Sequence, residues 1–76
     1  MVKRVIQFIS EVGGIGSVES GTDLYQAGFS SARVLELLLA LEEEFHVTIP
    51  DKDFVAARTP EAIAGLIERL QQEQPA

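Results

Sequence analysis

The segment from Ser31 to His46 constrains the fold more than any other part of the sequence. It is rich in Ala, Leu and Glu, which are among the strongest helix-forming residues. Its apolar residues recur at helical spacing along one face: Val34, Leu38, Leu41 and Phe45. Leu35 and Leu39 occupy a neighbouring face, so the middle of this helix is apolar over more than half of its circumference. Such a helix either lies deep in a core or uses part of its surface to contact something else.

Three other segments are also predicted to be helical. A first helix is expected over about residues 2–12, ended by Gly13 and Gly14, because its apolar residues share one face. A short helical turn is expected over residues 51–57. A last helix should begin with Thr59 as N-cap and Pro60 in the first helical position. The last helix has its own apolar stripe: Ile63, Leu66, Ile67 and Leu70. Residues 71–76 are expected to form a frayed polar tail.

The connection over residues 13–30 is long and rich in glycine. Long loops in compact domains are uncommon, and this one carries apolar residues that can hold it against the helices: Val18, Leu24, Tyr25 and Phe29. We therefore expect an ordered crossover. The predicted fold is all-α, a small four-helix bundle of three main helices and one short helix with a long first loop. It forms a single domain over residues 1–76, with an ordered core at about residues 2–71.

Composition excludes several classes of function. A chain of 76 residues without cysteine forms one domain and no disulfide. The net charge of −6, from twelve acidic and six basic residues, disfavours nucleic acid and anionic lipid. No apolar run approaches the roughly 20 residues that span a bilayer. His46 is the only histidine, and we assign it no catalytic role. With no catalytic triad or metal-ligand cluster, we expect a cytoplasmic, monomeric protein that is not an enzyme.

Ser30 and Ser31 are the candidate site residues, because they stand after Gly28 where the long helix begins. A helix N-terminus carries free N–H groups and partial positive charge, which favour a phosphate. Plain helix capping is the simpler explanation, since serine is a preferred N-cap. Both can hold, with Ser30 as the cap and Ser31 as the residue beside the phosphate.

Three motifs succeed one another at fixed spacing: Gly28-Phe29-Ser30-Ser31, the Leu-Glu-Glu-Glu-Phe run that ends at Phe45, and Ile49-Pro50-Asp51. The stretch DLYQAGFSSARVLELLLALEEEFHVTIPD resembles the phosphopantetheine-attachment region of acyl carrier proteins, and the resemblance covers about residues 20–70. It implies that 4′-phosphopantetheine, donated by coenzyme A through a phosphopantetheinyl transferase, is attached to Ser31. The adjacent Ser30 stays as the alternative attachment residue.

The resemblance also implies a function. Acyl carrier proteins hold an acyl or aminoacyl group as a thioester and present it to partner enzymes of fatty-acid, polyketide or specialised biosynthesis. Ser30 replaces the aspartate of the family motif, Ala32 replaces its leucine, and Arg33 stands where an acidic residue is common. With these departures, the motif is more similar to that of freestanding carriers outside the main fatty-acid pathway. Some of these carriers work beside ligases that load amino acids. Related carriers shelter acyl chains between their helices. Here the interior is expected to be lined by aliphatic residues and by small ones: Ala56, Ala57 and Ala62.

Partner docking is expected on the long helix. The candidate contacts are Ala32, Leu35, Glu36, Leu39, Glu42 and Glu43. Leu35 and Leu39 are equally well explained as core residues, and a glutamate cluster is more often simply a solvated face. The alternative function is a noncatalytic helical interaction domain whose acidic helix binds another helix or a basic groove.

Overall fold

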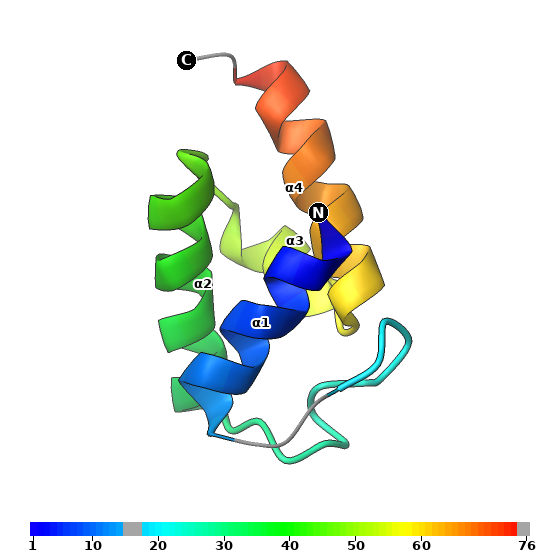
Figure 1. The fold of residues 1–76 in the computed structure, drawn as a ribbon. Helices are drawn as coiled ribbons and strands as arrows, with labels where there is room; N and C mark the ends of the chain where they lie inside the picture. Colours follow the sequence, from blue (N-terminus) through cyan, green and yellow to red (C-terminus); the bar gives the residue numbers. More distant parts are fainter. Residues whose placement is uncertain (15–17, 75–76) are drawn as a thin grey trace.

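A computed structural model describes residues 1–14 and 18–74 of the chain. It contains α1 (Val2–Gly13), α2 (Ser31–Phe45), α3 (Asp51–Ala56) and α4 (Pro60–Glu73), shown in Figure 1. The described residues form no strand. The prediction of an all-α bundle with three main helices, one short helix and a long first connection is therefore confirmed. No helix in these ranges is long and apolar enough to span a membrane.

Local signals in the sequence set the helix ends. Gly14 ends α1 in the left-handed conformation, with φ of 62°, and its N–H donates to the carbonyl oxygen of Ser10. Glycine adopts this backbone conformation without steric cost. The side chain of Thr59 accepts a hydrogen bond from the N–H of Ala62, and Pro60 is the first residue of α4. The predicted stop at the glycine pair and the predicted start at Thr59 are both confirmed.

The prediction that a frayed polar tail begins at residue 71 is wrong. α4 continues through Glu73, and Gln74 then joins it to the α2–α3 connection. The side-chain oxygen of Gln74 accepts from the N–H of Thr48 at 2.9 Å, and its amide nitrogen donates to the Thr48 carbonyl at 3.0 Å. These long-range hydrogen bonds hold the last turn of α4, so residues 71–74 are not frayed. Residues 75–76 of the predicted tail lie outside the described ranges.

The core is formed where α1 packs against α2 and α4 (Figure 1). Side chains from all four helices, from the long first connection and from the α2–α3 connection contribute to it: Val5, Ile9, Leu24, Phe29, Val34, Leu37, Leu38, Leu41, Val47, Ile49, Phe54, Ile63, Ala64, Leu66, Ile67 and Leu70. The predicted inner face of α2 is buried, apart from Phe45, which is half-buried. Leu37 is also fully buried, although it lies outside the apolar faces predicted for this helix.

The first connection is an ordered crossover in its described part, as predicted; residues 15–17 lie outside the described ranges. Two backbone hydrogen bonds join it to the α3–α4 connection and to the first turn of α4. The N–H of Leu24 donates to the carbonyl of Arg58 at 2.8 Å, and the N–H of Glu61 donates to the carbonyl of Ser20 at 3.0 Å. Leu24 is buried in the core as well, so the crossover is fixed by both packing and hydrogen bonds.

The prediction that Ala56, Ala57 and Ala62 line the interior is wrong. Ala56 and Ala62 are exposed and Ala57 is only half-buried. All three line a surface hollow between α3 and α4, beside the ion pair of Asp53 and Arg69. The aliphatic side chains expected there do fill the interior, and Ala64 is a small residue that lies among them. Alanine can occupy either environment at low cost, so its presence alone did not indicate burial.

Candidate functional site

The candidate site is the first turn of α2, where the two serines have different roles. Ser30 is the N-cap, in extended conformation, and its hydroxyl oxygen accepts a hydrogen bond from the N–H of Arg33 at 3.3 Å. Ser31 is the first residue of the helix and is exposed. Within the described ranges, the hydroxyl of Ser31 makes no hydrogen bond of its own. The capping predicted for Ser30 is thus present, and it leaves the Ser31 hydroxyl available.

Gly28 and Phe29 set the position of this turn. Gly28 has a φ of 107°, a conformation that residues with a side chain rarely adopt. It directs the chain so that the ring of Phe29 enters the core, and Phe29 is 5% exposed. A Cβ atom on Gly13 would lie 2.5 Å from the Phe29 ring, so the end of α1 meets this ring without space to spare. The ring packed against α1 therefore anchors the residue that precedes the serine pair.

The electrostatics at this helix start favour an anion. The first N–H groups of a helix have no partner within it, and their dipoles place partial positive charge there. Arg33 adds a guanidinium in the same turn, which pairs with Glu36 at 3.1 Å and donates to the carbonyl of Val12 at 3.4 Å. A phosphodiester on the Ser31 hydroxyl would thus meet backbone N–H groups and a nearby cation, and these residues fit such a group.

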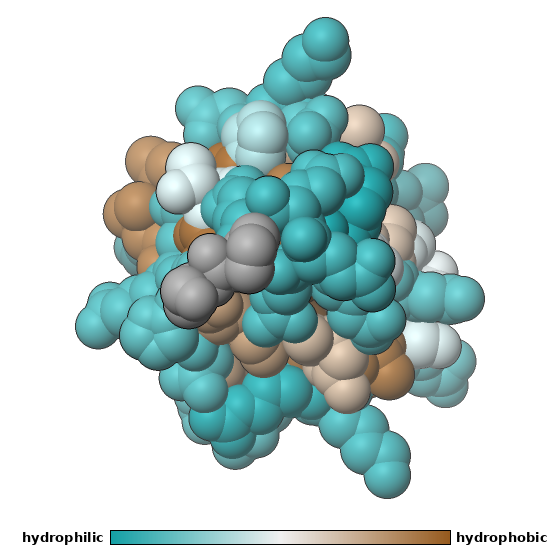
Figure 2. Space-filling model, turned by 90° about the horizontal axis from the view of Figure 1, so that it is seen from above, coloured by the Kyte–Doolittle hydropathy of each residue, from teal (hydrophilic) through white to brown (hydrophobic). Residues whose placement is uncertain are grey.

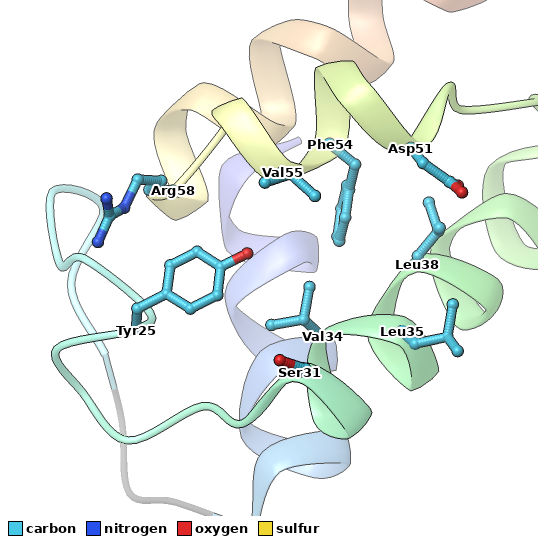
Figure 3. A pocket seen from close by; sticks show the side chains of 9 residues that line it. All are labelled: Tyr25, Ser31, Val34, Leu35, Leu38, Asp51, Phe54, Val55 and Arg58. Atoms are coloured by element: carbon cyan, nitrogen blue, oxygen red, sulfur yellow. The ribbon is translucent and has the colours of Figure 1, made fainter.

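Ser31 also lies at the edge of a hollow of about 550 Å³ between α2 and α3 (Figure 3). Nine residues line it: Tyr25, Ser31, Val34, Leu35, Leu38, Asp51, Phe54, Val55 and Arg58. The ring of Phe54 and the methyl groups of Val34 and Val55 face its middle. The hydroxyl of Tyr25 points into it. A group attached to Ser31 would therefore have a largely apolar surface beside it.

At the end of this hollow that is formed by the first connection, an ion pair and a cation–π contact fix the side chains. Arg58 lies over the ring of Tyr25, with its guanidinium carbon 4.9 Å from the ring centroid, and pairs with the carboxylate of Asp23 at 3.0 Å. Partial burial raises the pKa of Asp23, but hydrogen bonds from the N–H of Gln26, from Arg58 and from the N–H of Tyr25 outweigh it, so the pKa lies below its ordinary value. The Asp23 carboxylate therefore holds Tyr25 and Arg58 in place while it is ionised.

The outer face of α2 holds most of the predicted docking residues. Leu35 is 54% exposed and Leu39 is 57% exposed, so their interpretation as core residues is wrong. Val55 of α3, 55% exposed, is a further exposed apolar residue. Ala32, Glu36 and Glu43 are exposed. Seen from above, the surface is mostly hydrophilic, with a hydrophobic area at the edge where α2 lies (Figure 2).

Glu42 differs from the other predicted docking residues. It is half-buried, and its carboxylate accepts a hydrogen bond from the N–H of Ile49 at 2.8 Å. It therefore supports the α2–α3 connection from within the molecule. His46, at the end of α2, is exposed and has a left-handed φ of 54°. In the described part of the chain, no group of three or more His, Cys, Asp or Glu side chains could hold a metal ion.

The sequence does not assign Tyr25, Asp51, Val55 and Arg58 to the site. Its patterns indicate Tyr25 only as a packing residue and Asp51 only as part of a motif. The ion pair between Asp23 and Arg58 joins residues 35 positions apart, and no local spacing signals such a contact. Only the structure shows that the two connections meet beside Ser31.

Comparison with known proteins adds direct evidence to this geometry. The model of a family described as "Phosphopantetheine attachment site" matches residues 3–67. The acyl carrier protein of Bdellovibrio bacteriovorus is 38% identical over 42 residues, which are 55% of this chain and 54% of that relative. The matched region thus spans about half the length of the relative. Because the family model covers most of the chain and the fold is the small helical bundle expected for it, the chain belongs to the phosphopantetheine attachment-site family, whose domains bear covalently attached 4′-phosphopantetheine.

Proposed function

We propose that this chain is an acyl carrier whose 4′-phosphopantetheine is attached to the hydroxyl of Ser31. Loaded with an acyl or aminoacyl group, it would present this cargo to the enzymes of a biosynthetic pathway. The observation that carries the proposal is the exposed hydroxyl of Ser31 in the first turn of α2, which bonds to none of the residues that the structure describes and stands next to a cap that Ser30 already provides.

The cofactor supplies a terminal thiol on which cargo is held as a thioester. The residues of the chain position it. The N–H groups at the start of α2 and the guanidinium of Arg33 suit the phosphodiester, and the apolar hollow beside Ser31 offers a surface for the pantetheine arm and its cargo. Tethering raises the effective concentration of the cargo at each partner enzyme without any catalytic group on the carrier.

The partners implied by this role are a phosphopantetheinyl transferase, a ligase that loads the cargo, and downstream enzymes. We propose that they contact the outer face of α2, where Leu35 and Leu39 are exposed beside the carboxylates of Glu36 and Glu43. Charges at the rim of such an interface mainly set the encounter rate and the specificity. Arg33 makes this face less acidic near the attachment point, which supports a specialised pathway over housekeeping fatty-acid synthesis.

The test is modification by a phosphopantetheinyl transferase with coenzyme A, with mass spectrometry of the intact protein and of its peptides as the readout. One phosphopantetheinyl group should be added, and the modified peptide should carry it on Ser31. Ser31→Ala should abolish the gain in mass. Ser30→Ala is the matched control, because it should cost about 1 kcal/mol of stability as a lost N-cap but still accept the group. A full gain of mass by the Ser31→Ala protein would refute the assignment.

The exposed leucines of α2 also suit the second candidate, a noncatalytic interaction domain. That function would not require modification. It would be favoured if several transferases failed to modify the folded chain while a partner bound its unmodified form with an affinity that Leu35→Ala or Leu39→Ala weakened.

A further inference from the structure

The hollow beside Ser31 carries an uneven distribution of charge. Its cationic residue, Arg58, is already paired with Asp23 through two contacts, at 3.0 Å and 3.3 Å, and it also lies over the ring of Tyr25. The anionic residue, Asp51, lies at the other end of the hollow (Figure 3). Asp51 is exposed and has no ion pair with any residue of the described ranges. The charge that the lining offers to a ligand is therefore negative.

The shape of the hollow limits what it can hold. Its volume of about 550 Å³ falls within the range of small-molecule sites, and it opens to solvent along α2 and α3. Leu35 and Val55 in its lining are each more than half exposed, so the hollow lies at the surface of the molecule. The available space thus suits a group that stays at the surface, between α2 and α3.

Two further features place different chemical groups in different parts of the hollow. Val34 and Phe54 offer apolar surface in its middle, and the Tyr25 hydroxyl, which has no hydrogen-bond partner among the described residues, points into it. A phenol hydroxyl can donate to a carbonyl oxygen. A ligand with a carbonyl, a small apolar part and a cationic end would find a complementary group for each, with Asp51 facing its positive charge.

We infer that the hollow favours a short aminoacyl cargo, whose ammonium group lies near Asp51 and whose small side chain lies on Val34 and Phe54. This inference rests on the proposed function and names the class of cargo for the same site. A cargo that ends in a carboxylate would be repelled by Asp51, and the charge of Arg58 is already balanced by Asp23. An exposed ion pair is weak, so the expected preference over a neutral cargo is about two- to five-fold.

The test compares an alanyl cargo with a propionyl cargo, which lacks only the amino group. Each is attached to Ser31 by a transferase from a coenzyme A analogue in which nitrogen replaces the thioester sulfur, so that neither is lost by hydrolysis. Amide chemical shifts of ¹⁵N-labelled protein report contact with the hollow. Relative to the unloaded protein, alanyl should shift the amides of Leu38, Asp51 and Val55 at least about two-fold more than propionyl does.

Two variants separate the role of Asp51 from a general effect of charge. Asp51→Asn should remove the difference between alanyl and propionyl. Asp53→Asn is the matched control on the same helix, because Asp53 pairs with Arg69 and lines the other hollow, and it should keep the difference. Equal shifts from both cargoes, or a difference that survives in Asp51→Asn, would overturn the inference while Ser31 modification still stood. Failure of every transferase to modify Ser31 would instead refute the proposed function, and the inference with it.

Discussion

Replacement of Gly13 by alanine tests how the attachment turn is held in place. Gly13 is the last residue of α1, and a Cβ atom there would lie 2.5 Å and 2.6 Å from two carbons of the Phe29 ring. Overpacking of this kind costs about 1–3 kcal/mol. Alanine also gains about 0.5–1 kcal/mol over glycine in a helix. The expected net effect of Gly13→Ala is a loss of roughly 0–2.5 kcal/mol, centred near 1 kcal/mol, in the free energy of unfolding.

Gly65 provides the matched control. It lies within α4, and a Cβ atom there would meet nothing within 4 Å. Gly65→Ala should therefore stabilise the protein by about 0.5–1 kcal/mol. The same substitution should thus have opposite signs at the two positions. Urea unfolding monitored by circular dichroism measures both, and in a domain of this size 1 kcal/mol corresponds to about 4–8 °C in Tm.

A double-mutant cycle shows whether the Phe29 ring causes the loss. In a Phe29→Leu background the ring is absent, so Gly13→Ala should cost less than it does in the parent chain. If Gly13→Ala proved as stable as Gly65→Ala, or if its cost were unchanged without the ring, the ring contact would not be what positions the turn.

The other predictions concern the faces of α2 and the crossover. Leu37→Ala should lower the free energy of unfolding by about 2–5 kcal/mol, because Leu37 is fully buried, whereas Leu35→Ala should change it by less than about 0.5 kcal/mol; urea unfolding distinguishes the two. By the same assay, Glu42→Ala should cost about 1 kcal/mol more than Glu43→Ala, because only Glu42 accepts from the loop N–H of Ile49. The folded state lowers the pKa of Asp23, so its ionised form stabilises the protein above the ordinary pKa of 3.8 and that contribution is lost as the pH falls through the folded-state pKa. Asp23→Asn should therefore be less stable than the parent chain at pH 7, with the gap closing towards pH 2, and a gap that persisted there would contradict this.

The parts of the fold that depend on local signals could be predicted from the sequence. The glycine pair at the end of α1, the Thr59-Pro60 start of α4 and the N-cap Ser30 of α2 each act through neighbouring backbone groups, and each was found as expected. The spacing of apolar residues likewise located most of the buried face of α2.

The parts that depend on distant contacts could not be predicted. The last turn of α4 is held by hydrogen bonds between Gln74 and Thr48, which are 26 positions apart. The sequence also left open whether Leu35 and Leu39 are buried, because helical periodicity gives the apolar arc but not which elements cover it. α3 is a helix of only six residues, and both leucines stay exposed.

The separate roles of the two serines bear on how the chain responds to modification. The hydrogen bond that begins α2 belongs to Ser30, so a group joined to the neighbouring oxygen would displace no contact on which the helix depends. The unmodified and modified proteins can therefore share one backbone conformation and nearly equal free energies of unfolding. An enzyme that must distinguish the two forms would have to recognise the attached group itself, since the polypeptide would be nearly the same in both.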